Sequence, residues 1–186
     1  MKNLSGLTKE ETDIIVGSLL GDGCLRKMGR CIVPAFSVSH SESQKTYVFW
    51  KYDKLKRFIK TPPWREERVY RRTFYKNGVK IIPDDIASLL RDAPLALAVW
   101  LMDDGNRNHD AVFLNTQSFS LEDQKKLSRV LTGVFGFGTT INKHSVSNGK
   151  QLYRIRIDTK STKRLPKLMK DYFLPELRYK IPHFSP

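Results

Sequence analysis

Two short apolar runs recur along the chain, and each ends abruptly at Asp-Gly. The first extends from Ile15 to Gly23 and reads IVGSLLGDG, and the second extends from Leu97 to Gly105 and reads LAVWLMDDG. A run of this length predicts a buried helix, because a helix that crosses a membrane needs about 20 apolar residues. The runs are 82 residues apart, near the starts of two similar halves. The pattern therefore predicts two buried helices around which a duplicated fold is built.

Each run places a carboxylate at its C-terminal end, Asp22 in the first and Asp104 in the second. This placement is electrostatically unfavourable, because the macrodipole makes the C-terminal end of a helix negative and favours cations there. A bound metal ion would compensate both carboxylates. The alternative is two core helices that stop at glycine and expose their aspartates to water, and for either run alone this is the simpler interpretation. The repetition of the pattern favours a metal site.

The first helix is predicted to begin at Lys9, because Thr8 and Glu11 have the spacing of a capping box. Gly17 and Gly21 lie at its middle and end. A glycine inside a helix costs about 1 kcal/mol relative to alanine, so we expect these positions to let another backbone approach closely.

Residues 24–41 predict two strands joined by a turn, and a second capping-box pattern at 41–44 predicts an amphipathic helix that ends before Pro62. Its inner face is expected to carry Val48, Phe49, Tyr52, Leu55, Phe58 and Ile59. Its outer face is expected to carry Lys51, Lys54, Lys56, Arg57 and Lys60. Residues 65–80 then predict basic, aromatic strands with a turn at Asn77-Gly78, and a short helix follows over about 84–91.

In the second half, Asp92 is predicted to cap a helix that has Pro94 in its first turn. Residues 106–117 predict a strand pair, and Ser120 is predicted to cap a helix that ends near Gly136. The inner face of that helix is expected to carry Leu121, Leu127, Val130, Leu131 and Val134. A hairpin is predicted from 139–146 and 152–158, with its turn at 147–149.

The second strand of this hairpin alternates strictly between two faces. Tyr153, Ile155 and Ile157 share one face, which we expect to pack on helices, whereas Arg154 and Arg156 face something anionic.

A last helix is expected over 163–173, and each half then reads helix, strand pair, helix, strand pair, helix. Each half also contains a lysine followed by isoleucine and proline, at Lys80 to Pro83 and at Lys180 to Pro182. Repeats this long indicate a duplication and not a solenoid. The sequence therefore predicts two domains, residues 1–91 and 92–186.

The charge of the chain is strongly positive. Lys and Arg number 33 against 19 Asp and Glu, which gives a formal charge of +14 in 186 residues. The basic residues are spread along the chain among Tyr, Phe and Trp, as in proteins that bind a polyanion. This distribution argues against a disordered basic tail.

The remaining candidate ligands give little sign of a separate site. Two cysteines, Cys24 and Cys31, are too few for a disulfide framework or a four-ligand zinc site, and we expect reduced thiols in an intracellular protein. The four histidines show no ligand spacing and are expected to be sheet or loop residues: His40, His109, His144 and His183. We find no signal-peptide pattern and no membrane span, and expect a soluble protein that is not secreted.

The two motifs with their late lysines, together with the segment from Leu114 to Phe119, resemble the LAGLIDADG homing endonucleases of the compact single-chain type. The resemblance covers essentially the whole chain. It implies an α+β fold in which two αββαββα halves are related by a pseudo-twofold axis. Two antiparallel sheets would form a DNA-binding saddle, with the motif helices packed at the centre through Gly17, Gly21 and Ala98. Val99 departs from the family by replacing a small residue, which bears on how closely these helices approach.

The resemblance also implies which residues perform the chemistry. The catalytic residues would be Asp22, Asp104, Lys80 and Lys180, and the metal ligands would be Asp22, Asp104, Gly21 and Asp103. Hard carboxylate oxygens suit Mg²⁺, of which two or more ions are expected at the central site. The candidates for DNA binding are Arg26, Lys27, Arg30, Arg65, Arg71, Arg72, Lys143, Lys150, Arg154 and Arg156.

The function implied is a monomeric endonuclease that cuts both strands of a long, asymmetric DNA site in an organelle (chloroplast or mitochondrion) or in a bacterial cytoplasm. One alternative is an RNA maturase that binds its host intron RNA and assists splicing on the same scaffold. Another is a sequence-specific DNA-binding repressor. The presence of both aspartates and both lysines favours the enzyme, because the two alternatives have no chemical need for them.

Overall fold

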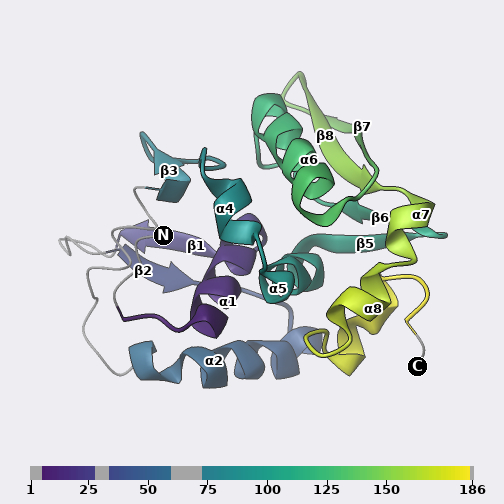
Figure 1. Ribbon diagram of the computed structural model, residues 1–186. Helices are drawn as coiled ribbons and strands as arrows, with labels where there is room; N and C mark the ends of the chain where they lie inside the picture. Colours follow the sequence, from purple (N-terminus) through teal and green to yellow (C-terminus); the bar gives the residue numbers. More distant parts are fainter. Residues whose placement is uncertain (1–5, 28–33, 60–72, 185–186) are drawn as a thin grey trace.

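The computed structural model describes residues 6–27, 34–59 and 73–184, and its α+β architecture follows the expected duplication (Figure 1). The N-terminal half contains α1 (Lys9–Leu20), β1 (Cys24–Lys27), β2 (Pro34–Ser37), η1 (Glu42–Gln44), α2 (Lys45–Ile59), β3 (Tyr75–Lys76), β4 (Val79–Lys80) and α4 (Ile86–Leu90). The C-terminal half contains α5 (Pro94–Asp104), β5 (Gly105–Asn108), β6 (Ala111–Leu114), α6 (Leu121–Phe135), β7 (Thr139–Ser147), β8 (Lys150–Ile157), α7 (Thr159–Thr162), α8 (Leu165–Met169) and η2 (Pro175–Lys180). The predicted order of helices and strand pairs is confirmed in both halves.

Helices α1 and α5 pack side by side at the centre of the molecule (Figure 1). Two glycines allow this contact. A Cβ atom on Gly17 would lie 2.4 Å from the Ala96 carbonyl oxygen and 2.7 Å from the Cβ of Val99, and one on Gly21 would lie 2.4 Å from the Cβ of Asp103. Val99 therefore does not hold the helices apart, because it fills the space that Gly17 leaves.

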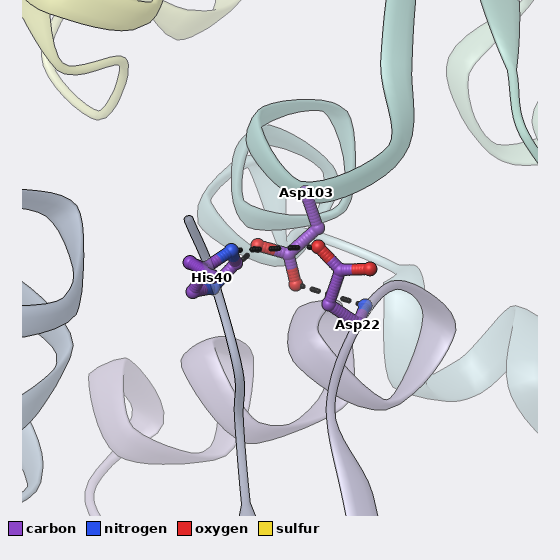
Figure 2. A group of neighbouring side chains, drawn as sticks. All are labelled: Asp22, His40 and Asp103. Atoms are coloured by element: carbon purple, nitrogen blue, oxygen red, sulfur yellow. Dashed lines mark hydrogen bonds and ion pairs between the residues drawn. The ribbon is translucent and has the colours of Figure 1, made fainter. Parts of the chain in front are cut away.

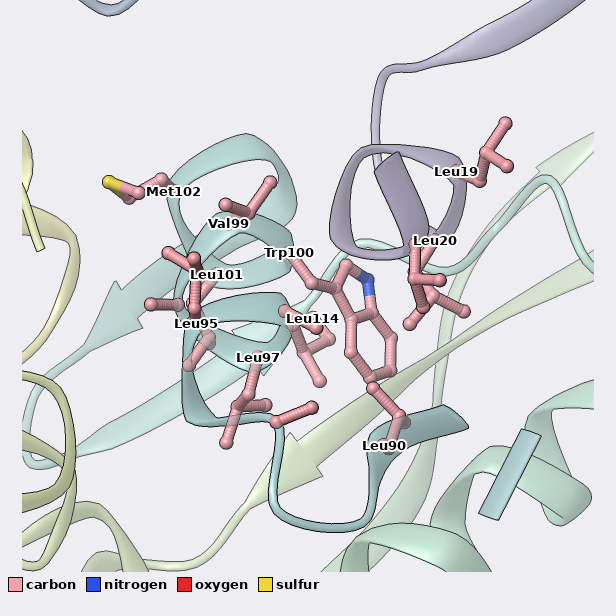
Figure 3. Packing of buried hydrophobic residues seen from close by; sticks show 14 of the residues in the cluster. Leu19, Leu20, Leu90, Leu95, Leu97, Val99, Trp100, Leu101, Met102 and Leu114 are labelled. Carbon is pink, nitrogen blue, oxygen red and sulfur yellow. The ribbon is translucent and has the colours of Figure 1, made fainter. Parts of the chain in front are cut away.

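A single apolar core surrounds the helix pair and draws on both halves. In α5 every residue from Leu95 to Met102 is buried, as expected of a helix that is apolar on all sides. The indole of Trp100 extends from α5 toward Leu20 and Leu90 (Figure 3). Among the described helices none combines the length and the apolar character needed to cross a bilayer.

The described strands form antiparallel sheets on the two sides of the helix pair (Figure 1). The C-terminal half carries one four-stranded sheet in the order β5-β6-β8-β7, and α6 packs on β7 and β8. In the N-terminal half the described strands pair as β1-β2 and β3-β4. Ile155 and Ile157 are buried, which confirms the predicted inner face of β8. The hairpin turns at Asn148 and Gly149, both of which have positive φ, as an Asn-Gly turn between strands requires.

The predicted inner face of α2 is correct at Leu55 but wrong at Phe49 and Tyr52. Phe49 and Tyr52 are 59% and 46% exposed, whereas the buried positions are Tyr47, Lys51 and Leu55. These three share one helical stripe at intervals of four residues. Hydrophobicity alone predicts that Lys51 and Tyr47 are exposed, but both side chains donate hydrogen bonds to the buried carboxylate of Asp103 on α5. Tertiary hydrogen bonds therefore decide which face of α2 turns inward.

Three local predictions about helix starts have different outcomes. Thr8 and Glu11 form the predicted capping box, and Ser120 accepts a hydrogen bond from the Asp123 amide at the start of α6. Ser41 makes no cap hydrogen bond, because its hydroxyl contacts Ser43 and a 3₁₀ turn precedes α2.

The other corrections concern Asp92, Leu121 and the C-terminal helix. Asp92 lies one residue before the N-cap of α5 and has a φ of 54°, so it cannot cap that helix, although Pro94 occupies the first turn as predicted. Leu121 is exposed at the first position of α6. The helix expected over 163–173 is shorter, because α8 covers only Leu165–Met169, and the separate short helix α7 (Thr159–Thr162) precedes the expected range. Pro166 lies in the first turn of α8, as predicted, where its missing N–H costs nothing.

Candidate active site

The C-terminal ends of the two motif helices meet, and they bring the two motif aspartates to one place. Gly21 caps α1 against Asp103 of α5, so Asp22 follows the end of one helix while Asp104 forms the last residue of the other. The absence of a side chain at Gly21 makes room for the Asp103 carboxylate. The structure therefore brings Asp22 together with the adjacent pair Asp103 and Asp104, which follow it by about 80 positions in the sequence.

A lysine closes the C-terminal end of each motif helix. Lys80 Nζ donates hydrogen bonds to the carbonyl oxygens of Gly21 and Gly23, at 3.0 and 2.9 Å. Lys180 Nζ donates to the carbonyl oxygens of Met102 and Asp103, the latter at 2.9 Å. The helix ends thus have the cations that the macrodipole favours, supplied by the two lysines that the sequence singled out. Burial lowers the pKa of both ammonium groups.

The carboxylate of Asp104 lies in a largely buried site, close to the further carboxylates of Asp22 and Asp103. Burial raises the pKa of Asp104 to about 8, with further contributions from the carboxylates of Asp22 and Asp103, while Lys80 and Lys180 oppose the shift. Burial and the Asp103 carboxylate also raise the pKa of Asp22. An additional cation would therefore stabilise the ionised form of both motif aspartates.

Asp103 is the centre of a buried hydrogen-bond network that the sequence did not predict. Its Oδ1 accepts from Tyr47 Oη at 2.7 Å and from Lys51 Nζ at 2.7 Å. Its Oδ2 accepts from Lys51 Nζ at 3.1 Å and from the backbone N–H of Asp22 at 3.3 Å. Both oxygens are thus occupied by protein donors. The Asp103 side chain fixes the relative positions of α2, α5 and the start of the Asp22 loop.

His40 completes the network: it contacts Lys51, and it lies beside Asp103 and Asp22 (Figure 2). Its Nε2 is 3.3 Å from Lys51 Nζ and 3.8 Å from Asp103 Oδ1, and its Nδ1 is 3.4 Å from Asp22 Oδ2. Burial, followed by the nearby Lys51 charge, lowers the pKa of His40, although Asp103, Asp22 and Gln44 oppose the shift. The ligand atoms of Asp22, His40 and Asp103 lie within 4.8 Å of one another. No sequence signal marked His40, because its partners come from distant segments.

The predicted DNA-binding residues lie on the strands where the structure describes them. Arg26 and Lys27 belong to β1, and the Arg26 side chain is exposed. Lys143 and Lys150 are exposed on the β7-β8 hairpin. The half-buried pair on β8 is Arg154 and Arg156, and the Arg154 guanidinium lies 3.7 Å from the centre of the Phe113 ring. The others, Arg30, Arg65, Arg71 and Arg72, lie outside the described residues.

Beside the end of α5 the surface is hollowed by a polar pocket of about 670 Å³. Its lining residues include Asn106, Arg107, Asn115, Tyr179 and Lys180. The sequence had singled out only Lys180 among these five. The other four carry hydrogen-bond donors but lie on three different elements or loops, and no local motif links them.

Comparison with known proteins identifies the same family that the two sequence motifs resemble. The sequence profile described as the LAGLIDADG DNA endonuclease family matches residues 12–70 and 60–165. The chain is 27% identical to cytochrome b mRNA maturase bI2 of Debaryomyces hansenii, over 96% of this chain and 76% of that protein. It is 26% identical to DNA endonuclease I-ChuI of Chlamydomonas applanata, over 94% of this chain and 95% of that protein.

Among solved structures, the homing endonuclease I-WcaI bound to its DNA recognition sequence has a similar fold. The TM-score is 0.81, with 21% sequence identity, over 96% of this chain and 88% of that chain. The saddle-like arrangement of duplicated halves that the sequence implied is thus an established fold.

Proposed function

This chain belongs to the LAGLIDADG DNA endonuclease family, and on that premise we propose that it is a site-specific endonuclease that cuts both strands of double-stranded DNA. The reaction is hydrolysis of one phosphodiester bond in each strand with the help of a divalent metal ion. Because one chain carries both halves, the enzyme would act as a monomer on a long site without dimer symmetry. The proposed location is an organelle or a bacterial cytoplasm.

The observation that supports this proposal best is the convergence of four groups. Asp22, Asp104, Lys80 and Lys180 meet at the joined ends of α1 and α5, and the pKa of Asp104 is raised to about 8. Strongly perturbed groups gathered at one place are typical of catalytic sites, because structural stability alone is better served by neutral residues. A protein that only binds nucleic acid has no need to concentrate buried charges there.

The residues present fit a divalent metal ion. Carboxylate oxygens are the ligands that Mg²⁺ prefers, and a cation would stabilise the ionised form of Asp104, which burial and the neighbouring carboxylates disfavour. We assign Asp22 and Asp104 as the side chains that would hold Mg²⁺. The Asp103 carboxylate is less suited, because protein donors occupy both of its oxygens. Gly21 was also expected as a ligand, and the carbonyl oxygens of Gly21 and Asp103 each accept a hydrogen bond from a lysine.

When bound, the metal would polarise the scissile phosphate and promote ionisation of the attacking water. Lys80 and Lys180 are proposed to stabilise the negative charge that develops during hydrolysis. Their hydrogen bonds to helix-end carbonyls fix each ammonium beside one motif aspartate and limit its motion. Preorganised cations of this kind lower the barrier because no reorganisation is needed during the reaction.

The DNA is proposed to lie across the two sheets, with the motif aspartates below the scissile phosphates. An antiparallel β-ribbon fits the major groove of B-DNA. Arg26, Lys143, Lys150, Arg154 and Arg156 supply positive charge from the strands of both halves. The four predicted arginines outside the described residues remain candidates on sequence grounds.

The test uses the isosteric variants Asp22→Asn and Asp104→Asn with wild type, on target DNA, in Mg²⁺, Ca²⁺ and EDTA. We expect wild type to cut both strands in Mg²⁺ and both variants to bind the DNA without cutting it. Binding can also tighten in the variants, because two carboxylates near phosphates repel them when no metal is present. If wild type binds tightly but never cuts with Mg²⁺, or if Asp104→Asn cuts both strands at the wild-type rate, the nuclease proposal is wrong.

A second candidate function is supported by the similarity to a protein named as an mRNA maturase. In that case the same scaffold would bind its host intron RNA and assist splicing. A splicing assay with the same two variants separates the functions, because a maturase role does not require the carboxylates. Splicing assistance that survives Asp104→Asn while cleavage is lost would show that both activities share the chain.

A further inference from the structure

The buried network around Asp103 is present on only one side of the active site. Helix α2 contributes Tyr47 and Lys51, and both bind the carboxylate of Asp103. The position that corresponds to Asp103 in the first motif is Gly21, which has no side chain to hold. The matching helix of the other half, α6, buries Gln124, Leu127 and Leu131 and, in the part of the chain described, no charged residue. The two motif aspartates therefore have different support.

The hydrogen bond from Lys51 determines which nitrogen of His40 carries the proton. An ammonium group has three donors and no acceptor, so the 3.3 Å contact of Lys51 Nζ favours His40 Nε2 as the acceptor over a proton shared with Asp103 Oδ1, which is 3.8 Å away. In a neutral imidazole the proton then lies on Nδ1. The Nδ1–H is therefore a donor, and it has no lone pair to offer a metal ion.

This donor is buried and directed at Asp22. The His40 side chain is 1% exposed, and within the described residues its Nδ1 makes no hydrogen bond. Asp22 Oδ2 lies 3.4 Å from this nitrogen (Figure 2). The backbone N–H of Asp22 is also held, by Asp103 Oδ2 at 3.3 Å. The side chain and the backbone N–H of Asp22 thus both contact residues of the Asp103 network.

We propose that His40, oriented by Lys51, is a positioning residue for the Asp22 carboxylate, and that it serves the cleavage of one DNA strand and not of the other. The inference rests on the proposed function, in which Asp22 and Asp104 each lie below one scissile phosphate. The Nδ1 of His40 faces the Asp22 carboxylate at 3.4 Å, and Asp103 Oδ2 accepts from the Asp22 backbone N–H, so both contacts limit the positions open to Asp22. Asp104 has no histidine partner among the described residues and takes its position from the end of α5.

The cleavage test compares His40→Phe and His40→Gln with wild type on a target labelled separately on each strand. Phenylalanine keeps a ring beside Tyr47, whose ring centre is 5.0 Å from that of His40, but removes both nitrogens. We expect His40→Phe to slow the cutting of one strand by about 10- to 100-fold more than the other, since small displacements of a catalytic group have effects of this size. Nicked DNA with the break always in the same strand would accumulate. Glutamine can both donate and accept hydrogen bonds, so His40→Gln should bring the two strand-cleavage rates closer together again.

Thr116→Val provides a matched control in the other half. Its hydroxyl makes a buried hydrogen bond to Gln124 Oε1 at 3.0 Å, and it is not part of the proposed catalytic set. This variant should lose stability without changing the ratio of the two cleavage rates. If His40→Phe slows both strands equally, or neither, while wild type cuts both, the positioning inference is overturned and the nuclease proposal stands.

A second measurement does not depend on cleavage. The ¹⁵N chemical shifts of His40 in the metal-free protein should show a protonated Nδ1 and an unprotonated Nε2, and Lys51→Met should remove this preference. A proton on Nε2 in wild type would contradict the inference. If wild type fails to cut DNA at all, the nuclease proposal fails, and the shifts alone then decide whether His40 directs a proton at Asp22.

Discussion

The ends of the two motif helices share a sequence pattern but have different surroundings. Asp22 follows Gly21, its side chain is 42% exposed, and a neutral histidine lies beside it. Asp104 follows Asp103, is more enclosed, and has a pKa of about 8. The deeper burial of Asp104 is the main cause of its raised pKa, and the neighbouring carboxylates of Asp22 and Asp103 add to it. The two ends also differ in sequence, because an aspartate at 103 has a buried lysine partner whereas a glycine at 21 has no side chain to pair. A duplicated motif can thus produce two unequal sites while the helices remain nearly symmetric.

The largest expected effect comes from removing the cation of the buried pair. Lys51→Met should lower the free energy of unfolding by about 3–5 kcal/mol, because it leaves the Asp103 carboxylate buried without its charged partner. Urea unfolding measures this loss. Lys56→Met is the control, since Lys56 is paired with Asp53 on the exposed side of the same helix, and should have little effect. Equal losses in the two variants would contradict the one-sided network.

The double variant Lys51→Met, Asp103→Leu sharpens this comparison. Replacing a buried ion pair with apolar residues of similar volume is often neutral or stabilising, so the second substitution should recover part of the loss. Recovery will be incomplete, because Tyr47 also donates to Asp103. A double variant less stable than Lys51→Met would show that Asp103 is held by groups other than the lysine.

A pH effect of a few kcal/mol should separate the two motif aspartates. The pKa of Asp104 rises from 3.8 to about 8 on folding, so between these values the native state binds more protons than the unfolded state. Stability should therefore fall as pH increases through this range and level off above pH 8, with a total on the order of a few kcal/mol. Unfolding in EDTA at several pH values measures it.

Asp104→Asn should remove most of this pH dependence. The variant should match wild type below about pH 4 and be more stable near pH 9, because asparagine keeps the shape without the charge. Mg²⁺ should stabilise wild type more than the variant at the higher pH. If wild type and Asp104→Asn have the same pH profile, Asp104 does not carry the buried charge.

The smallest effects concern the glycines of the central and outer helices. Gly17→Ala should destabilise the protein by about 1–3 kcal/mol, because its methyl group would overlap the Ala96 carbonyl oxygen and Val99. Gly133 of α6 is the control, since a Cβ there meets nothing within 4 Å. Gly133→Ala should stabilise the protein by about 0.5–1 kcal/mol through helix propensity. Thermal unfolding of both variants tests whether close helix contact is confined to the motif pair.

Much of the fold and part of the site follow from the sequence. The buried helices, the Thr8 and Ser120 caps and the Asn-Gly turns are correct, because each depends on neighbouring residues or on a short hydrophobic period. The Asp and Lys positions of the site could be found because the duplicated halves carry the same sequence pattern. Their convergence also follows from the repeat, since two equivalent helices that pack together bring equivalent ends to one place.

Only the tertiary structure decided the rest. The inward face of α2, the burial of Lys51 and the role of His40 depend on Asp103, which is more than 50 positions away from two of them and more than 60 from the third. A polar residue is buried only where a distant partner compensates its lost hydration, and hydrophobic periodicity carries no information about that partner. The sequence by itself determined two carboxylates at the ends of two buried helices. The different surroundings of the two carboxylates came from tertiary packing, in which α2 contacts α1 and binds Asp103 of α5.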